Sequence, residues 1–249
     1  HYWRATLGLP QPGAPEIRTG PPPLMAEARA AGEIDAFAVG EPWGSQTVEH
    51  GVGALLLPGT AIWAFAPEKV LAIRAGWAEA NPDLAGRLMR SIWRACRWLG
   101  DPANRFLVSD LLSAPGRLPI AAEVIDRAVL GRLIISAEGE EREVPRLIEF
   151  FEGAATFPWR SQAAWIGAQL ARRYGLDPVQ AAATAAPVFR ADLYRRYLRR
   201  AGADLPGASQ KLEGALGAPT AVASEHGQMI LCPDQFFDRR IFDPDLPPR

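Results

Sequence analysis

The chain has 249 residues, of which 48% are apolar and 22% are charged. This length and composition predict one large domain or two of modest size, and they exclude an intrinsically disordered segment. The 27 basic residues nearly balance the 28 acidic ones, for a formal net charge of −1, which argues against nucleic-acid binding through a generally basic surface. Two cysteines are too few for a disulfide scaffold or a cysteine-based zinc cluster. Only two basic residues are lysines, Lys69 and Lys211, so each of them merits attention.

Short apolar segments and one helix-like stretch alternate from residue 16 to about residue 74. Strands are expected at 16–19, 34–39, 54–57, 61–65 and 70–73, separated by glycine and proline turns. A helix is expected over 22–29, where prolines precede good helix formers and Gly32 supplies the stop. Strand, helix and strand at this spacing predict an α/β unit with parallel strands.

From Asn81 onward the pattern is helical. Asn81 is a favourable N-cap and Pro82 suits the first helical position. Apolar residues then recur at helical spacing with arginines opposite them, which predicts a long amphipathic helix. These apolar residues are Leu84, Leu88, Ile92, Cys96 and Leu99. Further helices are expected at 103–113, 120–130, 160–174, 177–187 and 190–201, and the Gly- and Pro-rich residues from Asp204 onward are expected to form an irregular tail.

The motifs of common enzyme classes are missing from the sequence. It contains no Walker A motif, no HExxH, no CxxC and no GxSxG. His50 and His226 are the internal histidines, and neither has a nearby nucleophile with triad-like support. The spacing of the acidic residues does not indicate a hydrolase carboxylate pair. We therefore expect a protein that is not an enzyme and that uses no cofactor or metal.

Glu41 and Trp43 follow directly on the expected strand 34–39, in the run Val-Gly-Glu-Pro-Trp. Ligands of open α/β sheets bind at the carboxyl ends of strands, so an acid and an indole at this place are candidate ligand-binding residues. The alternative is a helix start, in which Pro42 occupies the first turn and Trp43 packs on the core. The residues alone leave both interpretations open.

Lys69 lies at the start of the expected strand 70–73, in the run Ala-Pro-Glu-Lys-Val. A lysine in an apolar setting needs a counter-ion, because an unpaired buried charge is unfavourable. That counter-ion is either a carboxylate such as Glu68 or a bound anion. From the local sequence alone, a structural ion pair is the favoured interpretation.

Two later segments also allow a structural or a binding role. Ser161 and Gln162 could face a ligand, although a helix start packed on the core through the preceding aromatic residues is favoured. The arginines of 190–200 are typical of a solvated helix face, and a contact with RNA or an acidic partner is the alternative.

No apolar run approaches the roughly 18 residues needed to span a bilayer. Residues 1–4, His-Tyr-Trp-Arg, show neither an initiator methionine nor the regions of a signal peptide. We therefore expect the chain to start inside a longer protein.

Several of these blocks together resemble the nitrate- and bicarbonate-binding proteins of bacterial ABC transporters. The blocks are Pro-Pro-Pro-Leu-Met at 21–25, Gly-Glu-Ile-Asp-Ala-Phe-Ala-Val-Gly-Glu-Pro-Trp at 32–43, Pro-Glu-Lys-Val-Leu at 67–71, Phe-Pro-Trp-Arg-Ser at 157–161, Arg-Ala-Asp-Leu-Tyr-Arg at 190–195 and Ile-Phe-Asp-Pro at 241–244. The resemblance runs through essentially the whole chain, in order. The Val-Gly-Glu-Pro-Trp and Pro-Glu-Lys blocks are its most specific parts.

The resemblance implies an α/β fold of the type-2 periplasmic-binding-protein kind, with two lobes and a ligand between them. It further implies that the N-terminal part of the first lobe is missing from this chain. Residues 1–82 are then expected to form the second lobe, and 83–249 a mostly helical return to the first lobe with an irregular C-terminal tail.

The resemblance also implies a role for Lys69. In the nitrate-binding branch the corresponding lysine looks like the charge partner of the oxyanion, whereas the bicarbonate-binding branch has an acidic residue there. A compact ammonium suits a small monoanion. On this ground the site is expected to comprise Lys69, Glu41 and Trp43, with nitrate or a similar small oxyanion as the ligand.

The implied function is that of a nitrate (or nitrite) receptor that delivers its ligand to an ABC permease and its ATPase subunits. It would act in the periplasm or at the outer face of the inner membrane, without direct contact to nucleic acid. One alternative is a cytoplasmic nitrate sensor of the same fold that regulates an antiterminator partner. A receptor for sulfonates or thiamine precursors shares the fold but should lack the Pro-Glu-Lys block.

Overall fold

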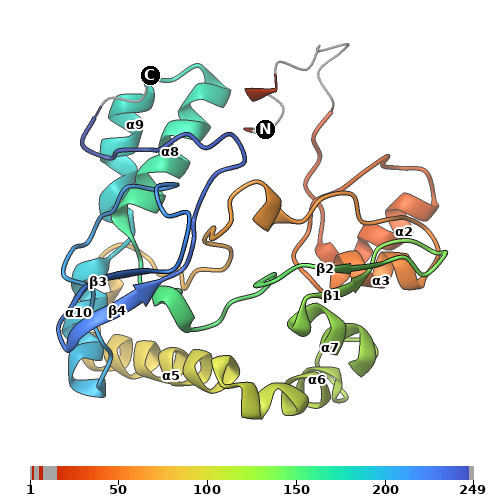
Figure 1. Ribbon diagram of the computed structural model, residues 1–249, viewed down its shortest axis with the longest axis horizontal. Coiled ribbons are helices and arrows are strands. Elements are labelled where there is room, and N and C mark those ends of the chain that lie inside the picture. The colour runs from red at the N-terminus through yellow and green to blue at the C-terminus, as the bar shows by residue number, and fades with distance from the viewer. Residues whose placement is uncertain (1, 3–5, 8–15, 247–249) are drawn as a thin grey trace. The chain divides into compact units, whose positions relative to one another are not determined.

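The computed structural model describes residues 2, 6–7 and 16–246, and these residues group into two compact units (Figure 1). Unit 1 comprises 1–8, 61–100 and 150–249, and unit 2 comprises 9–60 and 101–149. The unit boundaries fall after residues 8, 60, 100 and 149, and the assignment of 1–82 and 83–249 to two lobes of a whole protein stays a prediction. Apart from Tyr2, residues 1–4 lie outside the described residues.

Unit 2 is built from short helices around two small apolar clusters. Its elements are α2 (Met25–Ala30), α3 (Trp43–Glu49), α6 (Arg105–Ser113), α7 (Ala122–Leu130), β1 (Arg132–Ile134) and β2 (Glu141–Glu143). Helix α7 ends at Gly131, whose positive φ of 69° is the left-handed conformation that glycine adopts readily at a helix C-terminus. Strands β1 and β2 pair in antiparallel fashion, and Leu133 on β1 packs with Ile135 and Val144. A second cluster joins α3 to α7.

Unit 1 contains the larger core. Its elements are α4 (Trp77–Ala80), α5 (Pro82–Gly100), α8 (Arg160–Tyr174), α9 (Pro178–Ala185), α10 (Ala191–Leu198), β3 (Thr220–Ser224) and β4 (Gly227–Leu231). Helix α10 packs on α5, and β3 and β4 form an antiparallel hairpin. The main apolar cluster includes Trp93, Phe157, Trp159, Tyr194, Leu198, Leu205 and Leu231. These residues tie α5, α10, the hairpin and the segment before α8 into one core.

Helices α8 and α9 form a closely packed pair within unit 1, side by side in Figure 1. Small residues permit the close approach: a Cβ at Gly167 would lie 2.6 Å from the Cβ of Ala185. Asp177 begins α9 by accepting hydrogen bonds from the backbone N–H groups of Val179 (2.8 Å) and Gln180 (3.3 Å), and Pro178 occupies the first helical position.

The helices expected from the sequence are confirmed. The expected helix over 22–29 corresponds to a 3-10 turn at Pro22–Leu24 followed by α2, and the long helix from residue 82 is α5. The helices expected at 103–113, 120–130, 160–174, 177–187 and 190–201 correspond to α6, α7, α8, α9 and α10 within a few residues. These assignments rest on caps and apolar periodicity, both of which are local properties of the chain.

The expected strands are wrong for the chain as described. None of 16–19, 34–39, 54–57, 61–65 and 70–73 is a strand, and the parallel pairing is absent from the described residues, whose two sheets are antiparallel hairpins. Two isolated contacts remain: Trp63 bridges to Phe236, and the N–H of Leu55 donates to the carbonyl of Ile135 at 2.8 Å. A strand forms only when its backbone groups pair with a neighbour, and most of these groups have none here.

One further expectation needs correction. The residues from Asp204 onward are not wholly irregular, because they contain the β3–β4 hairpin. On α5, the apolar stripe is partly exposed at Leu84, Leu88 and Ile92, whereas Ala85 and Trp93 are buried. The apolar surface of α5 is wider than one stripe, and the contacts with α10 and the core cover its neighbouring arc.

Candidate functional site

Lys69 is an exposed cation with one adjacent partner. Its side chain is 81% exposed, and its Nζ contacts a carboxylate oxygen of Glu68, which is 62% exposed. Among the described residues, Glu68 is the only carboxylate that forms an ion pair with Lys69. The local sequence interpretation of an ion pair with Glu68 therefore holds, but the pair lies in water rather than in an apolar setting.

Lys211, the second lysine, has the opposite environment. Its side chain is 14% exposed, and its Nζ donates to Oε2 of Glu213 at 2.6 Å and contacts Oδ2 of Asp234. The side chains of Glu213 and Asp234 are essentially inaccessible to solvent. The ammonium also lies 5.9 Å from the ring centroid of Trp159, a cation–π contact.

Ser161, Lys211, Glu213 and Asp234 form one buried network, which we call the Lys211 network. The hydroxyl of Ser161 donates to Oε1 of Glu213 at 2.6 Å and accepts from the N–H of Lys211 at 3.1 Å, and Oδ1 of Asp234 accepts from the N–H of Leu216 at 2.9 Å. Burial raises the pKa of Glu213, against the opposing effects of the Lys211 charge and the Ser161 hydroxyl. The network fastens the segment after α10 to the first turn of α8.

This network was not predicted from the sequence. Its one signal was the rarity of lysine, together with a glutamate two residues beyond Lys211. Asp234 is distant in the sequence and could not be assigned to the pair. The network also engages Ser161, so the favoured interpretation of 157–162 as a helix start is supported: Phe157 and Trp159 are core residues, and Gln162 is buried.

Glu41 and Trp43 mark the start of α3. Oε2 of Glu41 accepts a hydrogen bond from the N–H of Ser45 at 3.1 Å, in the first turn of the helix. Trp43 packs against the cluster of Ile120, Val124 and Ile125. The helix-start interpretation thus accounts for both residues. Their role as ligand-binding residues, and that of Lys69, stays a prediction; Glu41 and Trp43 belong to unit 2 and Lys69 to unit 1.

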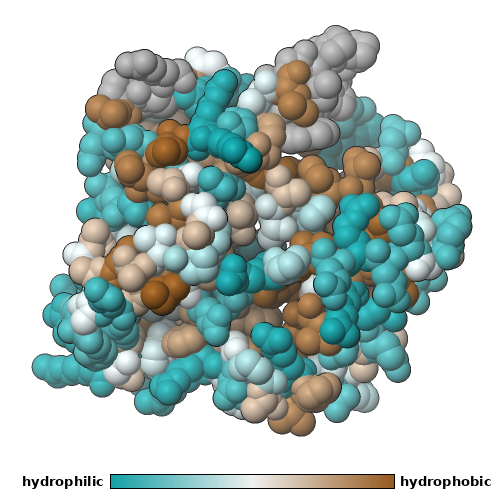
Figure 2. All heavy atoms as spheres, viewed as in Figure 1, coloured by the Kyte–Doolittle hydropathy of each residue, from teal (hydrophilic) through white to brown (hydrophobic). Residues whose placement is uncertain are grey.

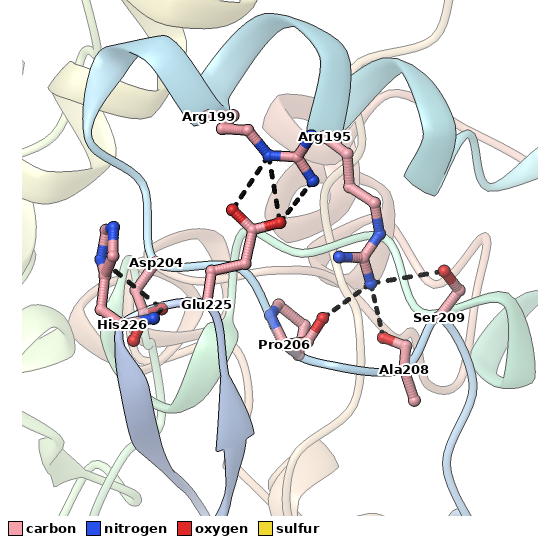
Figure 3. A network of polar contacts seen from close by, with 8 residues as sticks. All are labelled: Arg195, Arg199, Asp204, Pro206, Ala208, Ser209, Glu225 and His226. Atoms are coloured by element: carbon pink, nitrogen blue, oxygen red, sulfur yellow. Dashed lines mark hydrogen bonds and ion pairs between the residues drawn. The ribbon is translucent and has the colours of Figure 1, made fainter.

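Arginines in and directly next to α10 make contacts within unit 1 (Figure 3). Arg195 donates to the carbonyls of Pro206 at 2.7 Å and Ala208 at 2.8 Å. Arg199 pairs with Glu225 at the β3–β4 turn, and this pairing lowers the pKa of Glu225. At the start of α10, Arg190 pairs with Glu79 and Asp192. These contacts give Arg190, Arg195 and Arg199 a structural role, in which they hold neighbouring segments of unit 1 together.

The described residues show no candidate metal site and no membrane-spanning helix. No group of three or more His, Cys, Asp or Glu residues is arranged to hold a metal there. No described helix is long and apolar enough to cross a membrane. Cys96 and Cys232 are not joined by a disulfide.

Comparisons with known proteins place these observations in a family context. Residues 1–113 match a family model described as the NMT1-like family. The chain is 27% identical to the nitrate/nitrite binding protein NrtA of Synechococcus elongatus, over 99% of this chain and 52% of the relative. It is 32% identical to the nitrate import ATP-binding protein NrtC of the same organism (100% and 34%), and 25% identical to the bicarbonate-binding protein CmpA of a Synechococcus strain (99% and 53%).

A solved structure agrees with these sequence relatives. The periplasmic nitrate-binding protein NrtA from Synechocystis matches 99% of this chain and 60% of its own, with a TM-score of 0.81 at 25% identity. The fold is therefore the α/β fold of a periplasmic binding protein. The chain is a homologue of the nitrate- and bicarbonate-binding proteins, which confirms the resemblance seen in its sequence. It spans about a third to about half of the length of these curated relatives.

Proposed function

We propose that this chain belongs to the solute-binding component of an ABC transporter and that its ligand is nitrate, with nitrite as a close analogue. The observation that carries the proposal is the exposure of Lys69. Of the chain's two lysines, Lys211 is committed to two buried carboxylates, whereas Lys69 has one solvated neighbour as its partner. Lys69 can therefore offer its charge to an anion without leaving a buried carboxylate unpaired.

Nitrate is favoured over bicarbonate by the residue type at position 69. The resemblance implies a lysine at this position in the nitrate-binding branch and an acidic residue in the bicarbonate-binding branch. The ammonium supplies a compact positive charge to the anion, while hydrogen-bond donors elsewhere satisfy the other oxygens. Bicarbonate is the second candidate, because a bicarbonate-binding protein is similar over 99% of the chain. The proposal keeps Glu41 and Trp43 as further ligand-binding residues.

The proposed role requires no bond to be made or broken. The relatives are named for binding nitrate, nitrite or bicarbonate, and the sequence lacks the common catalytic motifs. Ligand binding would close the two lobes that the resemblance implies, and the closed form would dock on a permease with its ATPase subunits. The similarity to a nitrate import ATP-binding protein supports the association with an ATPase. We place this role in the periplasm or at the outer face of the inner membrane.

Calorimetric titration of the complete protein with nitrate and with bicarbonate tests the proposal. Lys69→Ala should weaken nitrate binding by roughly tenfold to a hundredfold, because a charge-assisted hydrogen bond is worth about 1.5–3 kcal/mol. Lys69→Glu should weaken it further through like-charge repulsion, and Lys69→Arg should retain part of the affinity. Arg87→Ala is the matched control, since it removes an exposed positive charge from α5.

Two results would contradict the proposal in different ways. Unchanged nitrate affinity in Lys69→Ala would mean that Lys69 serves only its ion pair with Glu68. Binding of bicarbonate without nitrate by the wild type would assign the protein to the bicarbonate-binding branch.

A further inference from the structure

Glu68 is adjacent to the candidate anion-binding lysine and carries the opposite charge. Its carboxylate contacts Nζ of Lys69, and both side chains are more than half exposed. The pair as a whole is neutral, so an approaching monoanion meets a dipole rather than a full positive charge. The charge of Lys69 becomes fully available only when the carboxylate of Glu68 moves away.

The exposure of both groups makes this displacement easy. Exposed ion pairs are weak, because water solvates each partner when the pair opens. The Lys211 network shows the contrasting case, in which two carboxylates are buried and cannot rotate into solvent. Nitrate and the Glu68 carboxylate both present planar oxygens to the same ammonium. They are therefore alternative partners for one donor.

We propose that Glu68 is an internal counter-ion that competes with the anion for Lys69 and so lowers the affinity of the site. This inference rests on the proposed function, because it assumes that Lys69 binds the ligand. Glu68 is thus a residue that tunes affinity and does not itself bind the anion. Removing its charge while keeping its shape should strengthen binding.

The test is calorimetric titration with nitrate of the complete wild-type protein and of Glu68→Gln, at low ionic strength. Glu68→Gln should bind nitrate about two- to fivefold more tightly, the factor that corresponds to the strength of an exposed ion pair. The effect should shrink at about 1 M salt, where the Debye length is only about 3 Å. Glu225→Gln is the matched control: it removes a carboxylate that also pairs with a basic side chain of unit 1, Arg199, and nitrate affinity should not change.

The double variant Glu68→Gln/Lys69→Ala separates competition for Lys69 from a general effect of charge. It should bind nitrate as weakly as Lys69→Ala, because without the ammonium there is nothing to compete for. Tightening by Glu68→Gln that persists in the Lys69→Ala background would overturn the inference, as would unchanged or weaker binding by Glu68→Gln in the wild-type background. Absence of nitrate binding by the wild type would instead overturn the proposed function, and the inference with it.

Discussion

Replacing Lys211 with methionine removes the only cation of the Lys211 network and keeps an unbranched apolar side chain that ends at Cε. Nζ of Lys211 donates to Oε2 of Glu213 at 2.6 Å and contacts Oδ2 of Asp234. The substitution leaves these two solvent-inaccessible carboxylates facing each other without a counter-ion. We therefore expect a large loss of stability.

The size of the loss follows from the burial of the pair. Breaking a buried ion pair by removing one partner costs about 3–5 kcal/mol, because an uncompensated buried charge remains. Lys69→Met provides the matched control, since it makes the same chemical change at a side chain that is 81% exposed. Surface substitutions of this kind change the free energy of unfolding by about 0.5 kcal/mol or less.

Urea unfolding of the complete protein, followed by circular dichroism, measures both variants. With a slope of about 3 kcal/mol per molar urea, the midpoint for Lys211→Met should fall by about 1–1.7 M, while that for Lys69→Met should stay within about 0.2 M of the wild type. Hydrogen exchange should show the loss in the segment 204–246. Equal midpoints for the two lysine variants would refute the assignment of Lys211 to a buried network.

Two further predictions concern the same unit and the unpaired segments. Burial raises the pKa of Glu213, so the contribution of its protonated form to stability is present at low pH and is lost as the pH rises through the raised value. In unfolding experiments at increasing pH, Glu213→Gln should therefore gain stability relative to the wild type. A stability difference that does not depend on pH would contradict this. If 54–57 and 70–73 are strands completed by polypeptide outside these 249 residues, their backbone amides should exchange slowly in the complete protein and rapidly in the isolated chain, and fast exchange in both would rule this out.

The helices could be predicted from the sequence because their determinants are local. Asn81 precedes α5 and Pro82 is its first residue, and Asp177 and Pro178 begin α9. Caps of this kind act within one turn of the helix, and apolar periodicity shows itself within three or four turns. What lies against each apolar face is a different question, and the partly exposed stripe on α5 shows that periodicity does not answer it.

The strands show the limit of the same reasoning. Val70 is 62% exposed and Leu56 is 83% exposed, although both lie in apolar runs that are typical of buried strands. Figure 2 likewise shows apolar residues interrupting the hydrophilic surface of the face that it draws. An apolar run indicates that a segment can be buried. Whether it forms a strand depends on backbone pairing with a neighbouring segment, which can be distant in sequence. The β3–β4 hairpin is the opposite case. Its strands do pair, but the many Gly and Pro residues around them led to the prediction of an irregular tail.

The two lysines explain why the candidate site could be only partly predicted. Local sequence offers each lysine a nearby glutamate, Glu68 for Lys69 and Glu213 for Lys211, and so cannot tell a replaceable counter-ion from a fixed one. The distinction comes from contacts that are distant in sequence. Asp234 and Ser161 contact the buried pair of Lys211 and Glu213, while the pair of Lys69 and Glu68 is exposed to water. An ion pair with Glu68 and a bound anion are therefore not competing explanations of Lys69. An exposed, weak pair leaves the ammonium accessible, and an anion can replace its partner at little cost.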